Sequence, residues 1–127
     1  MKIIKPAYSC MLTLAMDIVG GKWKMVVLWQ LRNGVVRFSE LKRQLNGVTQ
    51  KMLTQQLREL EESGLITRTV YPVVPPKVEY GLTEESKKLI PVLDALCQWS
   101  TDYAVSYGIT ESACCSSQRS IIKESGK

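Results

Sequence analysis

The sequence contains no histidine. Histidine is the commonest general base and metal ligand, and the Ser-His and Cys-His nucleophile arrangements both require it. Its absence excludes most classes of enzyme. We therefore expect a protein that has no catalytic activity of its own and binds no cofactor.

The C-x-x-C motif is also lacking, although the chain has four cysteines, Cys10, Cys97, Cys114 and Cys115. With no histidine to complete a tetrahedral ligand set, a structural zinc site is not expected, and we interpret the cysteines as free thiols. The adjacent pair near the C-terminus is either an incidental feature of a polar tail or a place for oxidation or a soft metal.

Long apolar runs are missing too, and no stretch is long enough to cross a bilayer. Lys2 and Lys5 lie near the N-terminus, as in a secretory signal. Pro6 and then Asp17 interrupt the apolar residues that follow, so this segment is a poor secretory signal. We expect a cytoplasmic protein without membrane association, in which thiols stay reduced.

The chain does contain a concentrated excess of positive charge. Its formal net charge is +5, and the segment 22–77 alone holds ten Lys or Arg and four Glu, a net +6. A basic stretch of this kind favours a polyanion, because each neutralised phosphate releases a condensed counterion. The alternative is a solvated basic surface without a partner.

The length of 127 residues fits one domain, which we place at 1–108, followed by a disordered polar tail at 109–127. Apolar spacing predicts helices over about 10–19, 22–32, 40–46, 50–63 and 84–107. Ser39, Thr49 and Thr83 are the expected N-caps of the last three.

Between 64 and 83 the pattern changes to that of a β-hairpin. The segment ITRTVY is rich in β-branched residues, KVEYGL is the expected partner strand, and the prolines between them predict a stiff, projecting turn. Two helices joined by a tight turn and followed by a hairpin indicate a winged helix-turn-helix. The predicted fold class is α+β, mainly α with a small β-hairpin.

The helix expected at 50–63 has one apolar stripe, formed by Leu53, Leu57 and Leu60. Because this stripe faces the core, the opposite side presents polar residues outward. These are Gln50, Lys51, Thr54, Gln55 and Arg58. Gln pairs with adenine and Arg with guanine in the major groove, and Thr contacts a thymine methyl or a phosphate. We predict that this helix reads double-stranded DNA; the alternative is a solvated polar face.

Charged residues near this helix refine the prediction. Arg68 and Lys77 flank the proline turn and are candidates for contact with phosphate or the minor groove, unless they are ordinary hairpin cations. Three glutamates are expected to lie toward the helix end, away from the DNA. These are Glu59, Glu61 and Glu62.

Four segments of the chain resemble one family of regulators. They are DIVGGKWKMVVLWQL, RFSELKRQL, VTQKMLTQQLRELEESGLITRTVYPVVPPKVEYGLT and PVLDALCQW, and the match as a whole covers about Cys10 to Trp99. In order and spacing they resemble the HxlR-type winged helix-turn-helix regulators, a MarR-related bacterial family. The resemblance implies a dimeric DNA-binding repressor or activator of a neighbouring operon. The DNA-contact positions that it implies are Gln50, Lys51, Thr54, Gln55, Arg58 and Lys77.

The last predicted helix has more apolar residues than one small domain can cover, which indicates a homodimer. The expected interface residues are Leu12, Met16, Leu89, Leu93, Leu96, Trp99 and Tyr103. Two-fold symmetry then requires a pseudo-palindromic operator. The alternative is that these residues pack on the first two helices of their own chain.

Cys10 stands just before the first predicted helix and near Lys5, where positive charge and free amides favour a thiolate. Some HxlR-type regulators have a cysteine at this place that senses oxidants or electrophiles, so Cys10 is the redox-sensing candidate; the alternative is an unreactive cysteine. Cys97, among apolar residues, is expected to be part of the packing.

These features predict a sequence-specific DNA-binding transcriptional regulator, with a small-molecule or oxidant inducer as a further expectation. The alternative from another class is a winged-helix protein-interaction adaptor without DNA sequence specificity. A thiol-dependent enzyme built on Cys10 lacks a base and ranks last.

Overall fold

The computed structural model describes residues 4–110, so all but the first two residues of the tail predicted at 109–127 lie outside the described residues. The elements in chain order are α1 (Met11–Val19), α2 (Lys24–Gln30), β1 (Val36–Arg37), α3 (Phe38–Gln44), α4 (Gln50–Glu62), β2 (Ile66–Tyr71), β3 (Lys77–Leu82), α5 (Glu84–Lys87) and α6 (Ile90–Tyr107). The chain forms two compact units, Met1–Leu93 and Asp94–Lys127, and their boundary falls within α6.

Helices α3 and α4 form the predicted helix-turn-helix. The side chain of Thr49 accepts a hydrogen bond from the amide of Met52 at 3.1 Å, which confirms Thr49 as the N-cap of α4. Leu53, Leu57 and Leu60 are buried, as the spacing predicted. Residues three and four apart lie on the same side of a helix, so the burial of these leucines fixes the rotation of α4 about its axis relative to the core.

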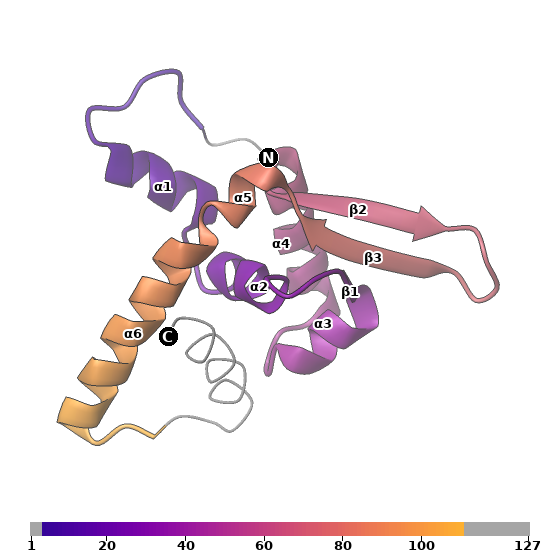
Figure 1. Cartoon of the computed structure of the whole chain (residues 1–127). Coiled ribbons are helices and arrows are strands. Elements are labelled where there is room, and N and C mark those ends of the chain that lie inside the picture. The colour runs from indigo at the N-terminus through magenta and orange to yellow at the C-terminus, as the bar shows by residue number, and fades with distance from the viewer. Residues whose placement is uncertain (1–3, 111–127) are drawn as a thin grey trace. The chain divides into compact units, whose positions relative to one another are not determined.

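The sheet contains the predicted hairpin and one further strand. Strands β2 and β3 pair antiparallel from Ile66 opposite Leu82 to Tyr71 opposite Lys77, and Figure 1 shows them as a ribbon extending away from α3 and α4. Strand β1 pairs with the other edge of β3, with Arg37 opposite Glu79, and gives the order β1-β3-β2. We did not predict β1, because two residues are too few to show an alternating pattern.

The prediction that Ser39 caps the third helix is wrong. Helix α3 begins one residue earlier, at Phe38, and its N-cap is Arg37 without a side-chain capping bond. Pairing of β1 with β3 keeps Arg37 extended, with φ −75° and ψ 154°, up to the first helical residue. Ser39 therefore lies inside the first turn of α3, where its side chain is exposed.

The single helix predicted at 84–107 is two helices. Thr83 caps α5 through a capping box with Ser86, as expected for its N-terminus, but α5 ends at Lys87. Pro91 has no amide to bond the carbonyl of Lys87, so the hydrogen-bond ladder of α5 cannot continue unbroken into α6.

Candidate nucleic-acid interface

The outward face of α4 is assembled as predicted. One shallow hollow is lined by Gln50, Lys51, Thr54, Gln55 and Arg58. Thr54 is half-buried, and the other four residues are exposed. Because the leucines on the opposite side are buried in the core, these five side chains have no other direction in which to point.

A second hollow joins this face to the hairpin. It is lined by Phe38, Gln50, Thr54, Leu57, Arg58, Glu61, Arg68 and Tyr80. It shares Gln50, Thr54 and Arg58 with the first hollow, so the two are continuous. Arg68 thus lies beside the outward face of α4, which is predicted to read bases, and pairing of β2 with β3 places Arg68 opposite Tyr80 instead of at the hairpin tip.

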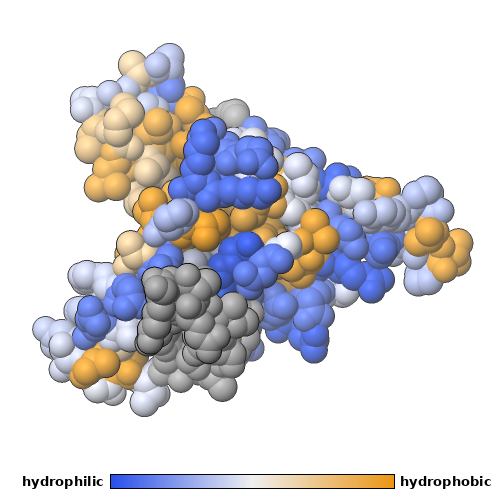
Figure 2. Space-filling view, in the orientation of Figure 1, coloured by the Kyte–Doolittle hydropathy of each residue, from blue (hydrophilic) through white to orange (hydrophobic). Residues whose placement is uncertain are grey.

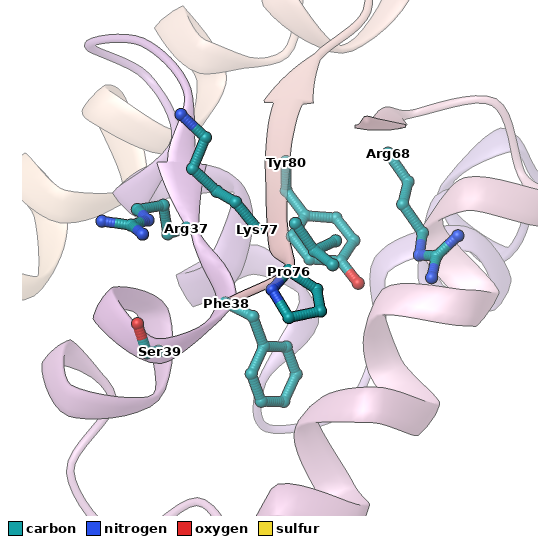
Figure 3. A pocket seen from close by; sticks show the side chains of 8 residues that line it. Arg37, Phe38, Ser39, Arg68, Pro76, Lys77 and Tyr80 are labelled. Atoms are coloured by element: carbon teal, nitrogen blue, oxygen red, sulfur yellow. The ribbon is translucent and has the colours of Figure 1, made fainter. Parts of the chain in front are cut away.

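A third hollow continues along the hairpin (Figure 3). Its lining residues are Arg37, Phe38, Ser39, Arg68, Pro76, Lys77, Val78 and Tyr80. Figure 3 shows the rings of Phe38 and Tyr80 beside Pro76, with Arg68 on one side of them and the charged ends of Arg37 and Lys77 on the other. The three hollows form one continuous band, which we call the basic band.

Arg37 and Ser39 are polar members of the basic band that we did not predict. Both are exposed at the start of α3, where a cation and a hydroxyl line the same hollow as Arg68 and Lys77. The sequence signal that could have indicated Arg37 was a basic residue directly before the first helix of a helix-turn-helix. We did not consider Ser39 as a contact residue because we interpreted it as a helix cap.

Lys77 is less available than its place beside the turn suggested. Its Nζ lies 3.6 Å from a carboxylate oxygen of Glu79 and 4.5 Å from the ring centroid of Tyr71. Beyond it, the hairpin tip is apolar: Val73 is 51% and Val74 99% exposed, and Figure 2 shows a hydrophobic patch at this end of the hairpin. In this hairpin, the wing of the fold, Arg68 lies within the paired strands and Lys77 at their tip end, so the exposed valines lie beyond both cations.

The glutamates of α4 do not all lie away from the reading face. Glu61 lines the second hollow together with Arg58 and Arg68, so a carboxylate stands within the basic band. Glu59 accepts a hydrogen bond from Gln55 at 2.7 Å. Both contacts differ from the expectation that helix position alone would separate the glutamates from the reading residues.

Cys10 is the N-cap of α1, and its side chain is exposed. The amides of Thr13 and Leu12 in the first turn of α1 hold the pKa of the Cys10 thiol below its usual range. We expected Lys5 to help lower the pKa of Cys10, but it does not. The Nζ of Lys5 lies over the ring of Tyr8, 5.9 Å from the ring centroid. Cys97 is half-buried.

The residues predicted to form the dimer interface differ in exposure. Leu12, Met16, Leu96, Trp99 and Tyr103 are exposed, whereas Leu89 is half-buried and Leu93 is buried in the core of its own chain. In α6 the rings of Trp99, Tyr103 and Tyr107 stack in series, with centroid distances of 5.4 and 4.5 Å.

Between residues 4 and 110, no helix combines the length and apolar character needed to cross a membrane. In the same residues, no three Cys, Asp or Glu side chains gather as a possible metal site.

Known proteins resemble this chain over most of its length. The model of the HxlR-like helix-turn-helix family matches residues 18–107. An uncharacterised HTH-type transcriptional regulator of Methanothermobacter thermautotrophicus is 56% identical over 96 residues, which cover 76% of this chain and 73% of that protein. The protein-interaction adaptor receives no support from these relatives.

Solved structures agree with the sequence relatives. The crystal structure of a putative HTH-type transcriptional regulator, YtcD, superposes with a TM-score of 0.70 at 50% identity, covering 74% of this chain and 96% of that one. The redox regulator HypR in its oxidised form superposes with a TM-score of 0.70 at 43% identity, covering 73% of this chain and 96% of that one. This chain therefore belongs to the HxlR-like helix-turn-helix family, whose members are transcriptional regulators.

Proposed function

We propose that this protein regulates transcription by placing α4 in the major groove of an operator while three neighbouring cations hold the adjacent DNA backbone. The observation that carries the proposal is the continuity of the basic band, in which base-reading side chains on α4 merge with Arg37, Arg68 and Lys77. Groups that read bases and groups that bind phosphate must lie on one surface for a single duplex to meet both. The protein acts in the cytoplasm and without catalysis of its own.

Gel shifts test this proposal directly. The probe is the duplex upstream of the protein's own gene, competed with unlabelled duplex of the same length and scrambled sequence. Specific regulators bind their site at least about a thousandfold more tightly than other DNA. Equal competition by both duplexes would contradict sequence-specific regulation.

The salt dependence of DNA binding distinguishes the contributions of two cations of the wing, Arg68 and Lys77. Arg68→Gln is expected to weaken binding to every sequence and to reduce the slope of log K against log salt by about 1, as for one lost phosphate contact. Lys77→Gln is expected to reduce the slope by less, because Glu79 already compensates part of the charge of Lys77. Fluorescence anisotropy across a salt series measures both slopes. Unchanged slopes would mean that these two residues do not contact DNA phosphates.

We propose that the functional form is a homodimer. Trp99 is 61%, Tyr103 46% and Tyr107 69% exposed on α6, which is more aromatic surface than a monomer usually leaves in water. Leu12 and Met16 add exposed apolar surface on α1. A two-fold dimer would bind a pseudo-palindromic operator with its α4 helices about 34 Å apart, one turn of DNA, or a multiple of that.

Trp99→Glu is expected to dissociate the dimer, because it places a charge in an apolar contact. Val74→Glu is the matched control: it adds the same charge at a 99% exposed apolar residue of the wing tip and is expected to leave the dimer intact. Sedimentation velocity distinguishes the two states. A monomeric wild type, or a dimeric Trp99→Glu variant, would contradict this interface.

A second proposed activity is control of DNA binding by oxidants or electrophiles through Cys10. It is supported by the exposed thiol, its lowered pKa and the likeness to HypR, which is named a redox regulator. A lowered pKa increases the thiolate fraction at neutral pH, and the thiolate is the form that attacks quinones and diamide.

Cys10→Ser is expected to keep its DNA affinity in reductant and to lose the response to diamide and to quinone. Cys97→Ser is the control, since Cys97 is half-buried and is expected to leave the response unchanged. Gel shifts with and without oxidant compare the variants. A full response in Cys10→Ser would remove Cys10 as the sensor.

A further inference from the structure

A buried lysine connects α2 to the reading face of α4. Lys24, the first residue of α2, is 6% exposed, and lysines are rarely buried unless paired. Its Nζ lies 2.7 Å from Oε1 of Glu59, whose side chain is 23% exposed. The other carboxylate oxygen, Oε2, accepts a hydrogen bond from Nε2 of Gln55 at 2.7 Å. The two oxygens of one carboxylate thus join a buried cation to a predicted base-reading residue.

This contact determines which end of the Gln55 carboxamide faces Glu59. An ionised carboxylate only accepts hydrogen bonds, so the amide nitrogen of Gln55 must face it, not the carbonyl oxygen. The nitrogen has a second N–H, and the contact with Glu59 leaves the carbonyl oxygen unused. A neighbouring donor and acceptor are what bidentate pairing with adenine N7 and N6 requires.

Lys24 favours the ionised form of this carboxylate. A glutamate is ionised at neutral pH in any case, and Lys24, and after it Gln55, hold the pKa of Glu59 below its usual range, so the acceptor form persists to lower pH. Lys24 also offsets a negative charge on the helix that approaches the DNA phosphates. Without the ammonium, Glu59 would face a polyanion uncompensated and would lose the partner that holds its orientation.

We propose that Lys24 and Glu59 are positioning residues for sequence reading, which hold the carboxamide of Gln55 in the orientation suited to adenine. The inference rests on the proposed function, because Gln55 must face a base. It goes beyond it by assigning a role in specificity to two residues that do not reach the DNA.

Selection from a library of randomised duplexes tests the inference. Gln55→Ala is expected to lose the preference for one base pair in each half-site, which identifies the position that Gln55 reads. Lys24→Met, which keeps the apolar stem, is expected to lose the same preference by roughly tenfold and to leave the other positions unchanged. In the Gln55→Ala background, Lys24→Met is expected to change the preference no further, because Lys24 acts through Gln55.

Lys88→Met is the matched control. It makes the same substitution and removes an ion pair with Glu85 at 3.4 Å, but both of these side chains are exposed and lie outside α4. Glu59→Gln is the second variant. Its neutral amide can donate as well as accept, so the carboxamide of Gln55 can face it in either orientation. We expect the same loss of base preference as for Lys24→Met. Melting curves establish which variants are folded.

The outcomes separate the two proposals. If Gln55→Ala abolishes a preference that the folded Lys24→Met and Glu59→Gln variants retain, the positioning role is overturned and the regulator proposal stands. An equal loss at all positions in these variants also overturns it, because that result indicates general destabilisation. If the wild type enriches no sequence, the regulator proposal fails and the inference fails with it.

Discussion

Arg58→Ala is expected to reduce discrimination between the operator and single-base variants by about 1 to 3 kcal/mol at the base pair that Arg58 reads. Arg58 is exposed and lines both hollows beside α4, which places it at the centre of the basic band. A guanidinium pairs with two acceptors of guanine at once, so its removal leaves both unpaired. Competition binding with duplexes mutated one position at a time measures the loss.

Lys87→Ala provides the control for net charge. It also removes one cation, but Lys87 lies on α5 and pairs with Glu84 at 3.1 Å in an exposed position. It is expected to leave the discrimination unchanged. If Arg58→Ala weakens all duplexes equally, Arg58 binds phosphate and does not read a base.

Leu53→Ala is expected to lower the free energy of unfolding by about 2 to 5 kcal/mol. Leu53 is fully buried, and truncation removes its contacts and leaves a cavity that the surrounding helices fill only in part. Urea unfolding followed by circular dichroism measures the change.

Met52→Ala is the neighbouring control. Met52 is 38% exposed on the same helix, and its truncation is expected to cost no more than about 0.5 kcal/mol. Similar losses for both variants would mean that α4 is rotated from the orientation described. The reading face would then be wrong as well.

Local features were predicted where the cause lies in neighbouring residues. The bounds of β2 and β3 follow from the prolines, because the β-branched run of β2 ends before Pro72 and β3 begins directly after Pro76. Thr49 caps α4 because its hydroxyl meets an amide only three residues away. The outward direction of Gln50 and Arg58 follows from the leucine spacing alone.

Features that depend on distant partners were missed. The strand at Val36–Arg37 exists because β3 offers an edge more than forty residues later in the chain, and Arg37 becomes part of the basic band through that pairing. The burial of Lys24 depends on Glu59, thirty-five positions further on. A charged residue without a known partner is expected to be exposed, so its own position gave no indication.

By itself, the sequence determined the class of fold and the side that α4 presents outward, because apolar periodicity and capping act over a few residues. Only the tertiary structure decided how far the interface extends and which side chains control one another. Sheet pairing brought Arg37 and Ser39 beside Arg68, and the packing of α2 on α4 brought Lys24 to Glu59. Such contacts join residues far apart in the chain, and chain folding, not local spacing, sets the distances between them.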